Sequence, residues 1–180
     1  MTRFVYAILL GLVGAGIVHI AILLLLPILS ERDSWSRLAR EADLYATVPL
    51  YGGPSREPLV RSYDPLFDAR ACRFDLSEGI VHVFAEGGVP FWSVSVYDRN
   101  GQNIYSFNER TASGGKLDFA VVTPVQMIEI RKELPVAFQS SIFVEAQADQ
   151  GIVVVRAFVP DPTWRPIVGR YLDGISCTLE

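Results

Sequence analysis

Hydrophobic and polar residues alternate on both sides of Asn100-Gly101, between Phe91 and Phe107. Alternation with a period of two is typical of a β-strand with one buried face, and Asn-Gly is a strong signal for a hairpin turn. The pattern therefore predicts a β-hairpin at the centre of the core. Its inward face should hold Trp92, Val94, Val96, Tyr105 and Phe107. Its outward face should hold Ser93, Ser95, Tyr97, Ile104 and Ser106, which form no set of acids, bases or metal ligands.

The register of this hairpin has two solutions. A two-residue turn pairs Val96 with Tyr105, whereas a four-residue loop over 98–101 pairs Val94 with Tyr105. Because the two registers differ by two residues, both turn the same side chains inward.

Further short segments with the same alternation follow along the chain, separated by turn signals. They cover residues 71–76, 80–85, 117–123, 142–147 and 152–159. Residues 125–131 fit either another strand or a turn of helix. The run 152–159 is apolar on both faces apart from Arg156, which is typical of a central strand, and Asp149-Gln150-Gly151 before it predicts a second hairpin. About eight short strands predict a mainly β domain, an antiparallel β-sandwich of the jelly-roll or immunoglobulin-like type.

The chain divides into three predicted parts: a membrane anchor over 1–32, a helix and linker over 33–58, and the β domain over 59–180. Asp33 is a plausible N-cap for a helix over 34–46, and prolines and glycines from Pro49 onward then interrupt regular structure. A short helix is also expected over 167–172, near the C-terminal end.

The anchor is predicted from the run Phe4–Ser30, which contains no formally charged residue. At about 1.5 Å per residue such a helix crosses a hydrocarbon core of about 30 Å. A cleaved signal peptide is the alternative, but its apolar core is typically about 7–15 residues long and ends at a small-x-small site. The junction Leu29-Ser30-Glu31-Arg32 has no such site, so we favour an uncleaved anchor.

Cys72 and Cys177 are the only cysteines. Without a Cys-x-x-Cys motif or clustered histidines they argue against a metal site. A disulfide between them would close a loop worth roughly 4–5 kcal/mol in the chain-entropy model, and two free thiols are the alternative. We favour the disulfide, which implies an oxidising compartment. Arg32, Arg37 and Arg40 after the apolar run weigh slightly toward the cytoplasm by the positive-inside rule.

Few residues suggest chemistry. The net charge of −4 gives no basic footprint for nucleic acid. The chain lacks a Gly-x-Ser-x-Gly elbow, a His-Glu-x-x-His motif and a phosphate loop, and it suggests no cofactor. The candidate ligand-binding residues are His82 and the cluster Asn108, Glu109 and Arg110 beside the hairpin. A hydrogen-bonded structural histidine and a solvated loop are the alternatives.

The segment Phe91-Trp92-Ser93-Val94-Ser95-Val96-Tyr97-Asp98 resembles a Trp-Ser-x-x-x-Tyr-Asp pattern in the paired bacterial domain-of-unknown-function families 1254 and 1214. A short anchored chain with one β domain is most similar to the stand-alone, membrane-anchored form of family 1254. The resemblance covers roughly residues 44–159, and only the hairpin is motif-like. It implies a companion protein of family 1214 as a partner, and it names no catalytic residues.

We therefore expect a single-pass protein of the bacterial inner membrane whose C-terminal β domain is periplasmic and binds a partner protein or a small ligand. A hydrolase or hydrolase subunit with a site near the hairpin is the alternative. A carboxylate within hydrogen-bond reach of His82 in a pocket would favour the hydrolase. A purely structural envelope protein, with helices pairing through Gly11 and Ala15, is a third hypothesis.

Overall fold

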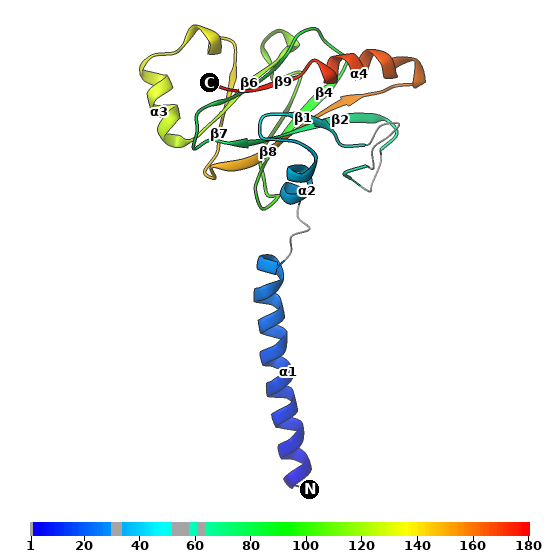
Figure 1. Ribbon diagram of the computed structural model, residues 1–180, viewed down its shortest axis with the longest axis vertical. Coiled ribbons are helices and arrows are strands. Elements are labelled where there is room, and N and C mark those ends of the chain that lie inside the picture. Colours follow the sequence, from blue (N-terminus) through cyan, green and yellow to red (C-terminus); the bar gives the residue numbers. More distant parts are fainter. Residues whose placement is uncertain (1, 30–33, 52–57, 61–63) are drawn as a thin grey trace. The chain divides into compact units, whose positions relative to one another are not determined.

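The computed structural model describes residues 2–29, 34–51, 58–60 and 64–180, and the chain forms two compact units, Met1–Asp33 and Ser34–Glu180. The first unit contains helix α1 (Thr2–Leu29; Figure 1). Its segment Thr2–Leu25 has a mean hydropathy of 2.7 and is long and apolar enough to cross a membrane, a property that a signal sequence shares. The predicted cap Asp33 and the predicted boundary at residue 32 lie outside the described residues.

The second unit is mainly β, with two sheets (Figure 1). The first sheet is antiparallel throughout, in the order β1 (Thr47–Pro49), β2 (Phe67–Asp75), β8 (Gln150–Phe158), β4 (Trp92–Asp98) and β5 (Asn103–Asn108). The second sheet has the order β7 (Ile142–Glu145), β6 (Leu117–Val122), β3 (Val81–Ala85) and β9 (Ser176–Leu179). Its strands are antiparallel except for the parallel pair β6 and β7.

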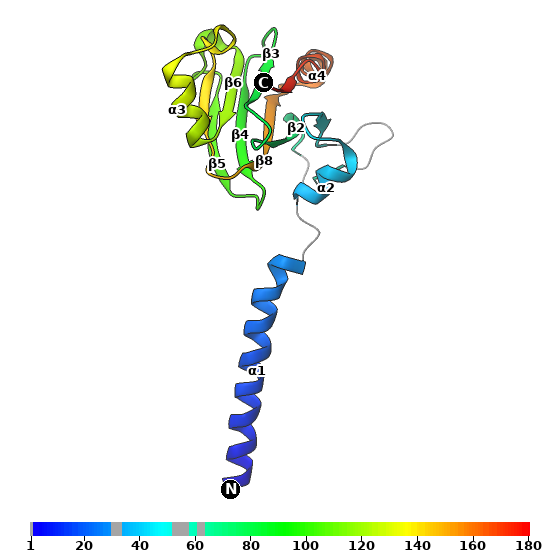
Figure 2. The same cartoon turned by 60° about the vertical axis from the view of Figure 1, so that its left-hand side comes forward.

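Short helices complete this unit: α2 (Ser34–Glu41), α3 (Pro124–Lys132), α4 (Arg165–Asp173) and the 3-10 turns η1 (Ser113–Gly115), η2 (Val136–Phe138) and η3 (Pro162–Trp164). Helix α3 begins at a capping box, in which Thr123 Oγ1 accepts from the Gln126 N–H at 3.2 Å and Gln126 Oε1 accepts from the Thr123 N–H at 2.8 Å. Helices α2 and α3 lie on opposite sides of the β domain (Figure 2).

Both sheets contribute to one hydrophobic core. Trp92, Val94 and Val96 of β4 are fully buried in the same cluster as Val81 and Val83 of β3. The Trp92 indole N–H donates to the Gly115 carbonyl at 3.0 Å, the partner that a buried indole requires. Smaller clusters lie outside the sheets, one between α2 and the outer face of the first sheet and one between α3, η2 and the outer face of the second.

The predicted hairpin is β4–β5. It pairs Val96 with Tyr105, as the register with a two-residue turn predicts, but Tyr97 then pairs with Asn103, so the loop covers the three residues 99–101 and Gly101 has a left-handed φ of +86°. Tyr105 lies opposite Val96 and so on the predicted inward face, but it is 44% exposed. A bulge after Val96 shifts the register, and Ile104, which was predicted on the outward face, packs against the core. Because β5 is an edge strand, nothing in the sheet covers Tyr105 on its far side.

The central position of β8 is confirmed, but the second hairpin is wrong. Strand β8 lies between β2 and β4, whereas β7 joins the other sheet beside β6. Residues 124–132 form a helix, which resolves the alternative that the sequence left open. The predicted helix over 34–46 ends at Glu41, and strands β1 and β9 were not predicted. Three- and four-residue strands carry too few positions to show a period of two.

Candidate functional site

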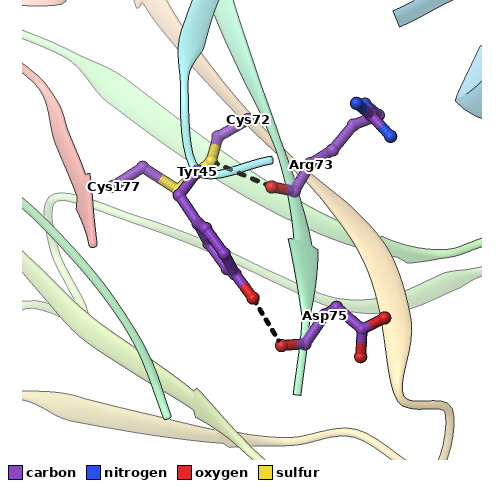
Figure 3. Close-up of a disulfide and its surroundings, with 5 residues drawn as sticks. All are labelled: Tyr45, Cys72, Arg73, Asp75 and Cys177. Carbon is purple, nitrogen blue, oxygen red and sulfur yellow. Dashed lines mark hydrogen bonds between the residues drawn. A yellow bond between two sulfur atoms is a disulfide. The ribbon is translucent and has the colours of Figure 1, made fainter. Parts of the chain in front are cut away.

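A disulfide joins Cys72 on β2 of the first sheet to Cys177 on β9 of the second sheet (Figure 3). The two Cα atoms are 6.6 Å apart, within the range of natural disulfides, and both side chains are buried. The bond therefore links the two sheets covalently through the core.

Tyr45 lies beside the disulfide (Figure 3). Its φ of 62° is unusual for a residue with a side chain, and polar contacts of its N–H and its hydroxyl hold it in place. Its N–H donates to the Arg73 carbonyl at 2.9 Å, and its hydroxyl contacts the Asp75 carbonyl at 2.8 Å and Glu78 Oε2 at 3.0 Å. Burial, followed by the bond to Glu78, raises the pKa of Tyr45 to about 12. The residue is thus a neutral structural anchor for the end of β2.

His82 meets a carboxylate on the outer face of the second sheet. Its Nε2 lies 3.0 Å from Asp118 Oδ1, and its ring centroid is 5.1 Å from those of Phe84 and Phe138. A cavity of about 340 Å³ touches Asp118, but its lining, Phe84 to Gly87 and Lys116 to Asp118, does not include His82. The predicted histidine therefore has the carboxylate that a base needs, but it does not line this cavity.

The other contacts of Asp118 close this cluster. Ser140 Oγ donates to its Oδ2 at 2.7 Å, and Ser141 Oγ donates to its Oδ1. Burial raises the pKa of Asp118, but the hydrogen bonds from Ser141, His82 and Ser140 outweigh it and hold this pKa below its ordinary value. In a hydrolytic triad the nucleophile bonds to the histidine. Here both serines bond to the carboxylate, so the arrangement fits a structural role.

The predicted cluster after the hairpin lies at the end of β5. Asn108 Oδ1 accepts from the Arg110 N–H at 3.2 Å, and Arg110 Nε is 3.7 Å from Glu109 Oε1. The Arg110 side chain is 88% exposed, as the solvated-loop alternative predicts. Among the described contacts none joins these residues to His82, whose strand belongs to the other sheet.

Sequence reasoning missed a polar network on the outer face of the first sheet. Arg156 of β8 lies opposite Ser93 of β4, and its guanidinium extends along the sheet. Its Nη1 donates to Ser95 Oγ at 3.2 Å and its Nη2 to Tyr97 Oη at 3.3 Å. Ser106 Oγ is 3.1 Å from Ser95 Oγ. The one signal in the sequence was a single charge within the apolar run 152–159.

A cavity of about 370 Å³ opens beside the turn of the central hairpin. Its lining comes from three separate segments and comprises Asp75, Ser77, Arg99, Asn100, Ala148, Asp149 and Gln150. The Arg99 backbone N–H donates to the Gln150 carbonyl at 3.0 Å, which fastens the turn to the start of β8.

Three of the lining side chains form a hydrogen-bonded relay. Arg99 Nη1 donates to Gln150 Oε1 at 2.9 Å, and Gln150 Nε2 donates to Asp75 Oδ2 at 2.6 Å. The Ser77 hydroxyl donates to Asp75 Oδ1 at 2.6 Å. The bonds from Gln150 and Ser77 lower the pKa of Asp75, so it is ionised at neutral pH. The cavity therefore presents an anion, a cation and neutral amides held in fixed positions.

No group of three or more histidine, cysteine or acidic side chains suited to a metal ion occurs within the part of the chain that the structure describes. The candidate chemistry is therefore that of hydrogen bonding and charge.

The sequence model of DUF1254, a family of proteins of unknown function, matches residues 71–178. The chain belongs to this family. The match covers both sheets from β2 to β9, so the DUF1254 assignment suggested by the hairpin motif is confirmed over most of the β domain. A comparison with curated proteins found no match.

Two solved structures are similar to this DUF1254 chain. The VPA0106 protein from Vibrio parahaemolyticus is 12% identical with a TM-score of 0.59, and the alignment covers 81% of this chain and 34% of that one. An uncharacterized protein from Burkholderia cenocepacia is 14% identical with a TM-score of 0.46, over 72% of this chain and 37% of that one. This chain thus spans about a third of the length of these solved structures. The first likeness shows a shared fold.

Proposed function

We propose that this protein is a single-pass inner-membrane protein whose periplasmic β-sandwich binds a small polar ligand in the cavity beside the hairpin turn. Three observations support the placement: the apolar helix α1, a disulfide of the kind that persists in oxidising compartments, and one core shared by two sheets. The ligand function rests on the relay of Arg99, Gln150 and Asp75, which lines a cavity within the usual size range of ligand pockets.

The cavity lining favours a neutral ligand rich in hydroxyl groups, such as a saccharide. Asp75 and Asp149 outnumber Arg99, which disfavours an anion. Asp75 already accepts hydrogen bonds from Ser77 and Gln150, and Arg99 lines the same cavity, which reduces the attraction for a cation. A hydroxyl group both donates and accepts a hydrogen bond, so it satisfies carboxylate, amide and guanidinium partners alike. The relay also holds its members in place before binding, which reduces the entropy lost when a ligand is ordered.

The hydrolase alternative has less support. Its candidate base His82 bonds to Asp118, but Ser140 and Ser141 bond to the same carboxylate and not to the imidazole. A nucleophile needs its base within hydrogen-bond reach.

Binding of a partner protein is the second candidate. The alignment with the VPA0106 protein covers 34% of that chain, and the proposal of a partner rests on the surface of this chain. Helix α3 and the turn after it expose Val125, Ile128 and Val136, at 66%, 58% and 82%. Exposed apolar side chains of this kind are typical of interaction sites. The companion protein of family 1214 implied by the hairpin motif is the proposed partner.

Ligand binding is tested with the full chain in a neutral detergent, by saturation-transfer NMR against glucose, N-acetylglucosamine and cellobiose. We expect transfer from the protein to at least one saccharide, and hydrogen-exchange protection of the segments around Arg99 and Gln150. The variants Gln150→Ala and Asn100→Ala should abolish or reduce transfer, since both residues line the cavity. Gln147→Ala, an exposed glutamine three residues away, is the matched control. Transfer that is equal in all four proteins would contradict the proposal.

Membrane topology has its own test. A fusion of alkaline phosphatase after Glu180 should be active in cells, because that enzyme folds only in an oxidising compartment. An inactive fusion that is expressed at the normal level places the β domain in the cytoplasm and contradicts the periplasmic part of the proposal.

A further inference from the structure

The polar network around Arg156 is separate from the hairpin cavity and does not depend on the function proposed for it. Arg156 projects from the outer face of β8, because its neighbours Val155 and Ala157 point into the main core. Helix α2 and its cluster cover Ala69 and Val154 on the β2 side of this face. The side toward β4 and β5 remains accessible, since Tyr97 is partly exposed and Ser106 is exposed.

The guanidinium of Arg156 has no acidic partner among the described residues. Its two contacts, at 3.2 and 3.3 Å, go to the neutral oxygens of Ser95 and Tyr97, and both are longer than a charge-assisted hydrogen bond of about 2.7–2.9 Å. Arg70 on the neighbouring strand makes a contrast, because it bonds to the carboxylates of Asp68 and Asp173. Arg156 is partly buried, yet its charge is held in place without being neutralised.

The neighbours of Arg156 leave a second donor beside it. Burial raises the pKa of Tyr97, but hydrogen bonds from Arg156, Ser95 and Asn103 outweigh this and lower it below the ordinary value. Because the phenol oxygen accepts the hydrogen bond from Arg156 Nη2, its own O–H can donate to a further acceptor. A ligand at this place therefore meets guanidinium N–H groups and a phenol O–H, all of them donors.

We propose that Arg156 and Tyr97 form an oxyanion-binding site for the carboxylate group of a small organic acid. One unmatched positive charge fits one negative charge, which favours a carboxylate over a phosphate dianion. Two other arginines differ from Arg156, because Arg73 and Arg99 both lie over the Trp35 ring, with their guanidinium carbons 5.0 and 5.7 Å from its centroid. The only lysines are Lys116, which directly precedes β6 of the second sheet, and Lys132, the last residue of α3.

The site is tested by saturation-transfer NMR with acetate as the probe, using the full chain in a neutral detergent and chloride to keep the ionic strength constant. The wild type should give a saturable acetate signal. Arg156→Gln should abolish it, and Arg156→Lys should weaken it because the planar fork is lost. Tyr97→Phe should weaken binding by about tenfold at most, the loss expected for one hydrogen bond. Arg170→Gln, which removes an exposed arginine on α4, should leave the signal unchanged.

Several outcomes would overturn the proposal. One is an acetate signal that Arg156→Gln and Arg170→Gln reduce equally, since that reports net charge alone. Another is displacement of acetate by inorganic phosphate at a concentration below that at which acetate half-saturates the site. That result would make the site one for phosphate. If Arg156→Gln does not fold, Tyr97→Phe decides, because it removes one oxygen atom, and an unchanged acetate affinity in that variant contradicts the site. The saccharide experiment uses different residues, so either proposal can fail alone.

Discussion

The outer faces of the two sheets both carry polar side chains, but they differ in how charge is matched. On the second sheet, Asp118 receives hydrogen bonds from His82, Ser140 and Ser141, and Phe138 packs on the imidazole. On the first sheet, Arg156 contacts two neutral oxygens and no carboxylate in the described part of the chain.

This difference separates structural polar groups from candidate binding groups. A charge whose hydrogen bonds are complete contributes stability and has little left to offer a ligand. A partly buried charge that lacks a counter-ion contributes little stability, or costs some, and keeps donors available. The residue singled out from the sequence, His82, belongs to the cluster with Asp118, Ser140 and Ser141, here called the matched cluster. Arg156, which has no counter-ion among the residues that the structure describes, was noted only as an exception in an apolar strand.

The largest expected effect comes from removing the link between the two sheets. The double variant Cys72→Ala, Cys177→Ala should lose about 4 kcal/mol of unfolding free energy, because the bond closes a loop with a sequence separation of 105 residues. Urea unfolding of the full chain in detergent measures this loss. Cys72→Ala alone should lose a similar amount, since either change removes the bond. A loss below about 1 kcal/mol would show that the sheets are held by packing alone.

The next effect concerns the apolar cover of the matched cluster. Phe138→Ala should lose about 3 kcal/mol, because Phe138 is 4% exposed and packs on both His82 and Phe143. Phe84→Ala is the matched control on the same face. Phe84 is 36% exposed, so its loss should be clearly smaller in the same urea experiment. Equal losses would mean that Phe138 does not seal the cluster.

Removing the carboxylate itself should have an intermediate effect. Asp118→Asn should lose about 1–3 kcal/mol, because three donors lose a charged acceptor. Since the pKa of Asp118 is lowered on folding, its stabilisation is fully present above about pH 4, the unfolded value, and is lost as the pH falls through the folded pKa. The wild type should therefore lose more stability than Asp118→Asn between neutral pH and pH 2. If the wild type and Asp118→Asn lose stability in parallel as the pH falls, the ionised carboxylate does not stabilise the matched cluster.

The smallest effect is expected at Arg156, and it sharpens the comparison most. Arg156→Gln should change the unfolding free energy by less than about 0.5 kcal/mol, because no ion pair is lost. Arg70→Gln is the control and should lose about 1 kcal/mol, since it breaks contacts to two carboxylates, one of them well exposed. If Arg156→Gln is the more costly change, Arg156 is structural and the two faces do not differ as proposed.

The sequence was sufficient for local features. The apolar helix, the β4–β5 hairpin with its turn glycine and the central position of β8 all follow from patterns within a few residues. Even there, the exposure of Tyr105 and the inward packing of Ile104 were not predicted, because an edge position and a bulge depend on neighbouring strands. The hairpin predicted between β7 and β8 was wrong for the same reason, since a turn signal does not show which sheet the next strand enters.

The sequence by itself determined that the chain has an apolar N-terminal helix, a β domain with alternating strands and a hairpin motif of its family, because each is written in the spacing of nearby residues. Only the tertiary structure decided which side chains meet. Arg156 reaches Tyr97 across 59 residues of sequence, and Gln150 reaches Asp75 across 75. Such contacts are set by the order of strands in a sheet and by the packing of two sheets on one core, and no local pattern specifies either.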